Sequence, residues 1–292
     1  MKKILVPVDF SDHTKTVCAF ALEIAKKAGG EIRLFHAYFD YVMIASSSFP
    51  YSVDTSEMFN QEMMVKIREE AKADLQNLED RLVNELKEQN IRNVHIVHTL
   101  TGGIPEDEIV NIAETYDPDI IVMGTRGKGN KDILTGKVTS KVVKNVKCRI
   151  LTVPVNAKYS GFKNMLYATN LADEDEKDLR RLFELLITYK PVIHCIHINI
   201  DNDKFTDENK MNSLKTYFED EIREGRLVFK VIDNVDFLDG INTYVNENRI
   251  DIISIVHHRK SFLKSLFTKD HTHELLFHSD IPLYIFPGNQ EL

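Results

Sequence analysis

Long apolar runs are missing from this chain. No stretch approaches the roughly 20 apolar residues needed to cross a bilayer. The opening Met1-Lys2-Lys3 leads directly into a short strand-like run, without the apolar segment of a signal peptide. Cysteine is also scarce: Cys18, Cys148 and Cys195 are odd in number, widely separated and set among apolar residues. We therefore expect a soluble, cytoplasmic protein with buried, reduced thiols, no disulfide framework and no membrane partner.

An excess of basic residues is missing as well. The 292 residues include 37 Lys and Arg against 45 Asp and Glu, a formal net charge of −8. Nucleic acid is bound by clustered basic side chains that neutralise phosphates, so this balance disfavours binding over the whole surface. Any phosphate contact is expected to be local.

Short apolar runs alternate with helical patterns in the first half of the chain. Ser11 is a candidate N-cap for the first helix, and Gly29-Gly30 end it. Residues 39–53 form a polar loop that is a candidate lid, and a long charged helix begins near Thr55. Near-continuous apolar strands separated by helices predict a doubly wound, parallel α/β sheet. The five expected strands cover 3–8, 32–38, 94–100, 120–123 and 150–155.

The sequence repeats itself. Residues 164–170 resemble the opening strand, so that Asn170 lies 161 positions after Asp9, and the same shift places His197 on His36 without a gap. Residues 119–121 correspond to 251–253 at a shift of 132, and Pro154 corresponds to Pro287 at a shift of 133. The chain is therefore expected to hold two domains of one fold, 1–157 and 158–292, joined by the polar stretch 156–161.

A glycine-rich segment follows the expected fourth strand. It runs Gly124-Thr125-Arg126-Gly127-Lys128-Gly129-Asn130, and a helix is expected to begin near Gly136-Lys137. Glycines let backbone amides approach an anion, and the helix N-terminus adds free N–H donors and partial positive charge. A solvated basic helix after a glycine-rich turn is the alternative. The position at a carboxyl strand end, where open α/β sheets bind ligands, favours a phosphate cradle.

Asp9 ends the first expected strand. If the first and fourth strands are neighbours, its carboxylate can accept hydrogen bonds from a base or ribose while the glycine loop holds phosphates. A role as an N-cap or turn residue is the alternative. The segment is not the phosphate-binding loop of nucleoside triphosphatases, because Lys131 and Val138 occupy positions that require Gly and Ser or Thr. The dinucleotide fingerprint also fails, since it must follow the first strand.

These residues resemble the universal stress protein family. The resemblance rests on 4–9, 121–127, 134–139 and 151–155, covers the first repeat and extends faintly to the second. It implies a tandem member with two five-stranded, Rossmann-like domains of the adenine-nucleotide α-hydrolase type. It also implies ATP, AMP or ADP as ligand, with Mg²⁺ left open. The implied cofactor-binding residues are Val8, Asp9, Ala37, Met123, Gly124, Arg126, Gly127, Gly129, Gly136, Lys137, Val138 and Thr139.

Two departures affect the loop. Only eight residues separate Gly127 from Gly136, one fewer than in the family's ATP-binding members, and Lys137 replaces their Ser or Thr. Gly129 is a candidate for relieving the shorter loop, and Lys137 can meet a phosphate as a charge. A shortened loop leaves AMP, ADP or another anion open as the ligand.

The second repeat lacks the cradle. Val256-His257-His258-Arg259 has no matching glycine, Lys269-Asp270 replaces Gly136-Lys137, and Asn170 replaces Asp9. A carboxylate at the helix start repels phosphate, which predicts a pseudo-site. The five histidines of this stretch are read as surface or packing residues rather than metal ligands, because no cysteine is nearby. They are His257, His258, His271, His273 and His278.

No catalytic set emerges from the spacing. The sequence shows no Ser-His-Asp arrangement, paired acids or evident general base. The leading hypothesis is a stress-response nucleotide-binding protein whose partner is a second copy or, within one chain, the other repeat. A slow ATP-hydrolysing enzyme and a nucleotide-free scaffold acting through its dimer interface are the alternatives.

Overall fold

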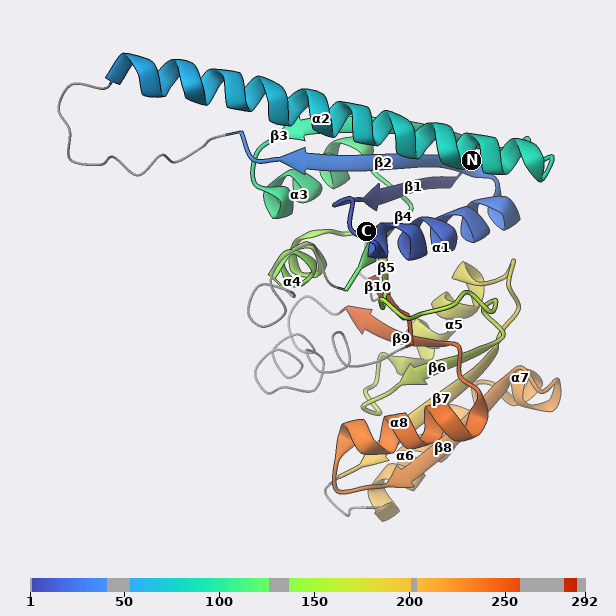
Figure 1. Ribbon diagram of the computed structural model, residues 1–292. Coiled ribbons are helices and arrows are strands. Elements are labelled where there is room, and N and C mark those ends of the chain that lie inside the picture. The colour runs from blue at the N-terminus through green and yellow to red at the C-terminus, as the bar shows by residue number, and fades with distance from the viewer. Residues whose placement is uncertain (1, 41–52, 126–136, 201–203, 258–280, 288–292) are drawn as a thin grey trace. The chain divides into compact units, whose positions relative to one another are not determined.

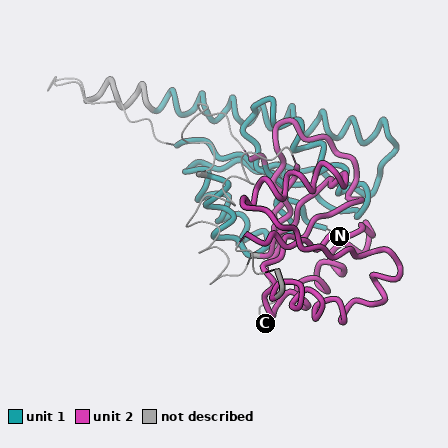
Figure 2. Tube along the Cα trace, turned by 90° about the horizontal axis from the view of Figure 1, so that it is seen from below, with its two compact units in different colours: residues 1–123, 127–148 teal, residues 124–126, 149–292 magenta. Residues whose placement is uncertain are grey.

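The computed structural model describes residues 2–40, 53–125, 137–200, 204–257 and 281–287 (Figure 1). The chain divides into two compact units (Figure 2). Unit 1 holds residues 1–123 and 127–148, and unit 2 holds 124–126 and 149–292. The domain boundary predicted from the repeats, between 157 and 158, stays a prediction. The predicted lid loop lies mostly outside the described residues, which omit 41–52.

Unit 1 is a parallel sheet in the order β3-β2-β1-β4. Its central strand β1 buries Ile4, Leu5 and Val6 completely, as expected for a strand covered on both faces. The strands are β1 (Lys2–Pro7), β2 (Gly30–Tyr38), β3 (Val94–Gly102) and β4 (Ile120–Gly124), and the helices are α1 (His13–Ala28), α2 (Val53–Glu88), α3 (Pro105–Tyr116) and α4 (Lys137–Asn145).

The helices of unit 1 pack in two pairs. Lys26 of α1 lies 4.0 Å from Glu85 of α2. Lys141 of α4 forms an ion pair with Asp107 of α3. Right-handed crossovers place α1 and α2 on one face of such a sheet and α3 and α4 on the other, which agrees with these contacts.

Helix α2 is long and amphipathic. Its 36 residues span about 54 Å at 1.5 Å per residue, and its N-terminal part continues past the end of β2 (Figure 1). Residues spaced by three or four positions form the buried stripe that packs on the sheet. They are Ala71, Leu75, Leu78, Leu82 and Leu86.

Unit 2 is a sheet in the order β5-β10-β9-β6-β7-β8. Strand β5 (Arg149–Val153) pairs antiparallel with β10 (Leu283–Pro287), and every other described pair is parallel. This pairing explains why β5, the last strand of the first repeat, groups with unit 2. The remaining strands are β6 (Asn164–Ala168), β7 (Val192–Asn199), β8 (Leu227–Asp233) and β9 (Ile252–His257).

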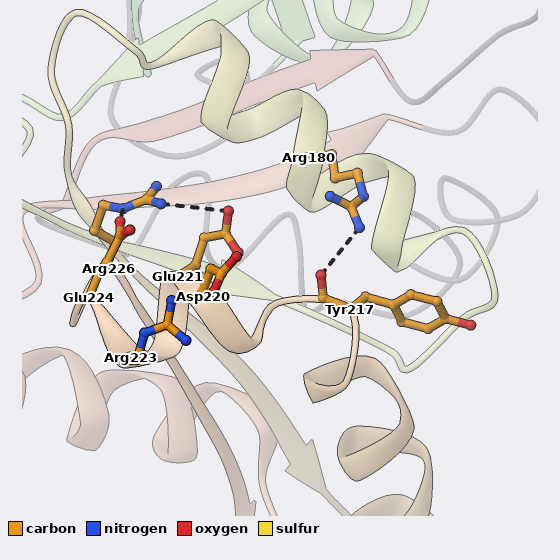
Figure 3. A network of polar contacts seen from close by, with 7 residues as sticks. All are labelled: Arg180, Tyr217, Asp220, Glu221, Arg223, Glu224 and Arg226. Carbon is orange, nitrogen blue, oxygen red and sulfur yellow. Dashed lines mark hydrogen bonds and ion pairs between the residues drawn. The ribbon is translucent and has the colours of Figure 1, made fainter.

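Helices α5 (Asp175–Leu185), α6 (Lys204–Lys215), α7 (Glu219–Arg223) and α8 (Phe237–Asn248) belong to unit 2. A polar network ties the segment around α7 to its surroundings (Figure 3). Arg180 of α5 donates to the carbonyl of Tyr217 at 3.2 Å. Arg226 contacts Glu224 at 2.6 Å and Glu221 at 3.6 Å. These exposed pairs position the short helix but contribute little stability each.

The duplication predicted from the sequence is confirmed in backbone detail. Phe10 and Leu171, 161 positions apart, have φ values of 58° and 56°. Asp117 and Arg249, the left-handed C-caps of α3 and α8, lie 132 positions apart and both have a φ of 51°. Non-glycine residues rarely adopt this left-handed conformation, so its recurrence at the shifts found in the sequence shows that the two repeats share one backbone path.

Two local expectations were wrong. Ser11 does not cap α1, which begins after Asp12 without a side-chain cap, because the Ser11 hydroxyl donates to Asp9 instead. Cys18 and Cys195 are buried as free thiols, whereas Cys148 is only partly buried.

Candidate functional site

The site lies where the order of strands reverses in unit 1. Strand β1 pairs with β2 on one side and with β4 on the other, where Ile4 and Leu5 face Ile120 and Ile121. The neighbouring positions expected for the first and fourth strands are therefore confirmed. The chain leaves β1 and β4 at the same edge of the sheet, which brings Asp9 to the edge where the glycine-rich segment begins.

Asp9 is held by its own loop. Its Oδ1 accepts hydrogen bonds from the Ser11 backbone N–H at 3.1 Å, the Ser11 hydroxyl at 2.7 Å and the Thr14 hydroxyl at 3.2 Å. The left-handed Phe10 between Asp9 and Ser11 turns the chain back so that these donors converge. Three donors on Oδ1 fix the orientation of the carboxylate. None of the three donates to its other oxygen, Oδ2.

That other oxygen, Asp9 Oδ2, is buried and has no hydrogen-bond partner among the described residues. A buried acceptor without a partner costs about 1–3 kcal/mol, and more when it belongs to a charged group. The cost is removed when a ligand presents an N–H or O–H group. Asp9 therefore has the geometry of a ligand acceptor as well as that of a turn residue.

Val8 and Ala37, two further predicted contacts, are buried. Both are 8% exposed. The Val8 N–H donates to the Phe35 carbonyl at 2.8 Å, and the Val8 carbonyl lies 2.7 Å from His36 Nδ1. A carbonyl can only accept, so this contact requires His36 to carry its proton on Nδ1. The Val8 N–H is therefore engaged within the sheet, and only the second lone pair of its carbonyl is left for a ligand.

The predicted phosphate cradle is described only at its ends. Met123 is buried, at 4% exposure, and Gly124 is the last residue of β4. Lys137 begins α4, Val138 is partly exposed and Thr139 is 3% exposed, all in its first turn. The helix expected after Gly136-Lys137 is present in the described residues, and its start stays a prediction because 126–136 lie outside them. The remaining predicted contacts, Arg126, Gly127, Gly129 and Gly136, lie outside the described residues.

Sequence reasoning missed two residues of the site, Ser11 and Thr14. The sequence predicts Ser11 as a helix cap and indicates no role for Thr14, although both hydroxyls donate to Asp9. The signal was present in the spacing Asp9-x-Ser11-x-x-Thr14, because hydroxyl side chains two and five residues after an aspartate at a turn can reach its carboxylate.

At the corresponding strand end of the second repeat, a buried carboxylate receives hydrogen bonds from side chains of its own repeat. Asp175 Oδ1 accepts from the Tyr167 hydroxyl at 2.6 Å, and Asp175 Oδ2 accepts from the Thr169 hydroxyl. Thr169 Oγ1 in turn accepts from the Leu171 N–H at 2.7 Å. Asn170, in the place of Asp9, is exposed. Both oxygens of the buried Asp175 carboxylate therefore have hydrogen-bond partners.

Burial is the largest cause of the pKa shift of Asp175. It raises the pKa of Asp175, and Asp178 adds to the increase, while the hydrogen bonds from Thr169 and Tyr167 oppose it. Burial likewise raises the pKa of Tyr167 well above its usual value, with further contributions from Asp175. The protonated forms of both groups are therefore favoured by folding.

Neither a metal cluster nor a membrane span is found in the described parts of the chain. No group of three or more His, Cys, Asp and Glu side chains within them could hold a metal ion. The side chains of His257, His258, His271, His273 and His278 lie outside these parts. Among the described helices, none is both long and apolar enough to cross a bilayer.

Comparisons with known proteins agree with the resemblance found in the sequence. Universal stress protein MJ0577 of Methanocaldococcus jannaschii is 32% identical over 159 residues, covering 52% of this chain and 94% of that protein. Universal stress protein YxiE of Bacillus subtilis is 28% identical over 152 residues, covering 52% and 97%. A universal stress protein structure from Archaeoglobus fulgidus covers 98% of this chain and 96% of its own, with 16% identity and a TM-score of 0.63.

The last comparison shows the fold of the whole chain, since it spans both repeats. The sequence profile of the "Universal stress protein family" matches residues 1–154. That match covers more than half of the chain and includes Asp9, Ser11, Thr14 and the entire glycine-rich segment. The chain belongs to the universal stress protein family.

Proposed function

We propose that this protein is a stress-response nucleotide-binding protein that takes ATP, AMP or ADP in its first repeat and uses its second repeat as a pseudo-site. The observation that carries the proposal is the buried, unpartnered Oδ2 of Asp9 at the strand-order reversal. An adenine nucleotide offers amino and hydroxyl donors for this oxygen and phosphates for the glycine-rich segment that follows β4.

Features of the second repeat support the proposal that only the first repeat binds nucleotide. There the buried carboxylate of Asp175 already receives two hydroxyl donors, and exposed Asn170 carries no charge. The sequence also has no glycine between β9 and β10. A repeat whose strand-end carboxylate is already satisfied, and whose sequence lacks the glycine cradle, is suited to assembly and stability rather than to nucleotide binding.

The proposal extends to assembly and location. The antiparallel pairing of β5 with β10 joins the last strand of the first repeat to the last strand of the second. This pairing supports an intramolecular pseudo-dimer of domains 1–157 and 158–292, which removes the need for a homodimer along those edges. We place the protein in the cytoplasm, with Mg²⁺ as an optional companion of the nucleotide.

The first test is mass spectrometry of nucleotide released from the purified protein. Titration calorimetry with ATP, ADP and AMP, each with and without Mg²⁺, then gives the affinities. Asp9→Asn removes the charged acceptor and is expected to weaken binding by about 1.5–3 kcal/mol, roughly 10-fold to 150-fold. Asp12→Asn is the matched control, because Asp12 lies on the same loop with a fully exposed side chain.

Gly127→Leu provides a second variant that leaves Asp9 intact and is expected to abolish binding by blocking the backbone approach to phosphate. Nucleotide recovered intact after incubation supports binding without turnover, whereas steady hydrolysis supports the enzymatic alternative. The proposal is wrong if the wild-type protein binds none of the three nucleotides, or if Asp9→Asn and Asp12→Asn bind equally well.

A further inference from the structure

The two repeats differ more in chemistry at the position of Thr14 than at the position of Asp9. It is 6% exposed, and its hydroxyl donates to Asp9 Oδ1. The residue 161 positions later is Asp175, which is 4% exposed. At the same structural position, one repeat therefore carries a donor that serves a neighbouring carboxylate, and the other carries a carboxylate that consumes donors.

The surrounding residues change together with this position. Thr169 and Tyr167, which donate to Asp175, correspond to Val8 and Val6 in the first repeat. Valine side chains have no hydrogen-bond donors, so these two positions cannot supply the donors that a carboxylate at position 14 would need. Its own carboxylate is instead located at Asp9, where the loop supplies the donors.

We propose that Ser11 and Thr14 are positioning residues that saturate Asp9 Oδ1 so that Oδ2 alone is presented to a ligand. The residue at the position of Thr14 determines whether a repeat leaves a carboxylate oxygen for a ligand or satisfies its carboxylate with its own side chains. With threonine, the strand-end carboxylate is held for a ligand. With aspartate and its two hydroxyl partners, the repeat fills its own site. The identity of the ligand rests on the proposed function, but the positioning does not.

Ligand-free protein provides the first test. The backbone amide of Ser11 donates to the same Asp9 oxygen as Thr14, so its exchange rate and proton chemical shift report the placement of the carboxylate. We expect Thr14→Val to accelerate exchange at Ser11 about tenfold, the effect of losing roughly one hydrogen bond to a charged group. Thr14→Ser restores the donor and the wild-type signal. Thr115→Val, on the exposed face of α3, is the control and leaves Ser11 unchanged.

Nucleotide affinity provides the second test. Thr14→Val is expected to weaken binding about tenfold and Thr14→Ser to keep it. Thr14→Asp is expected to abolish binding, because a second carboxylate beside Asp9 repels it and finds no donor at Val6 or Val8. Unchanged Ser11 exchange in both Thr14→Val and Ser11→Ala overturns the positioning role, whether or not nucleotide binds. Faster exchange in a protein that binds no nucleotide supports the positioning role and refutes the proposed function instead.

Discussion

Two buried threonines of unit 2 give opposite predictions for the same substitution. Thr169 is 6% exposed, and its hydroxyl donates to Asp175 while accepting from the Leu171 N–H at 2.7 Å. Thr152 on β5 is fully buried, and its hydroxyl has no partner among the described residues. Valine has nearly the same shape as threonine, so each Thr→Val change isolates the contribution of one hydroxyl.

The expected magnitudes follow from the hydrogen bonds. At a pH above the pKa of Asp175, where its carboxylate is charged, Thr169→Val removes a hydrogen bond to a charged group, worth about 1.5–3 kcal/mol, and one from a backbone amide, worth about 1 kcal/mol. We therefore expect a loss of roughly 2.5–4 kcal/mol in the free energy of unfolding of unit 2. Thr152→Val removes an unsatisfied buried hydroxyl and is expected to be neutral or to stabilise unit 2 by about 1 kcal/mol.

Urea denaturation followed by circular dichroism measures both changes, with separate transitions assigned to the units if they appear. At roughly 2–4 °C per kcal/mol for a domain of this size, the Thr169→Val midpoint should fall by about 5–15 °C in a thermal scan. The reasoning is refuted if Thr169→Val costs less than about 0.5 kcal/mol, or if Thr152→Val costs as much as Thr169→Val.

Two further predictions concern charge and backbone. Because burial raises the pKa of Asp175, its contribution to stability is fully present below the unfolded pKa of about 3.9 and is lost as the pH rises through the folded pKa. The unfolding free energy of the wild type should therefore fall relative to Asp175→Asn as the pH rises above about 4, and a pH-independent difference would contradict this. Gly30→Ala should cost more than about 4 kcal/mol, since a Cβ there lies 2.1 Å from the Lys2 carbonyl oxygen. Gly225→Ala, also at positive φ but with no atom within 4 Å, should cost only about 1 kcal/mol, and equal losses in thermal unfolding would argue against the steric explanation.

Much of the fold follows from local patterns. The strand at 3–8, the glycine stop at Gly29 and the start of α3 at Pro105 depend on neighbouring residues, and the structure has each of them within a residue or two. The ungapped match between Asp9 and Asn170 likewise predicted the duplication, because two copies of one backbone need the same pattern of buried and exposed positions.

The candidate site was only partly predictable. Asp9 could be located at a strand end, but the sequence left its roles as a cap and as a ligand acceptor open. The choice depends on which oxygen meets Ser11 and Thr14, and on whether the other is buried without a partner. Hydrogen-bond partners depend on rotamers and on the turn at Phe10, which no periodicity reveals.

By itself, the sequence determined the alternation of strands and helices, the two repeats and the negative net charge, because each depends on composition or on spacing along the chain. Only the tertiary structure decided that β1 lies between β2 and β4, that β5 pairs with β10, and that the second repeat turns Asp175 inward where the first presents Asp9. These outcomes depend on hydrogen bonds between segments far apart in sequence, and buried polar groups select such partners only when the whole sheet has formed.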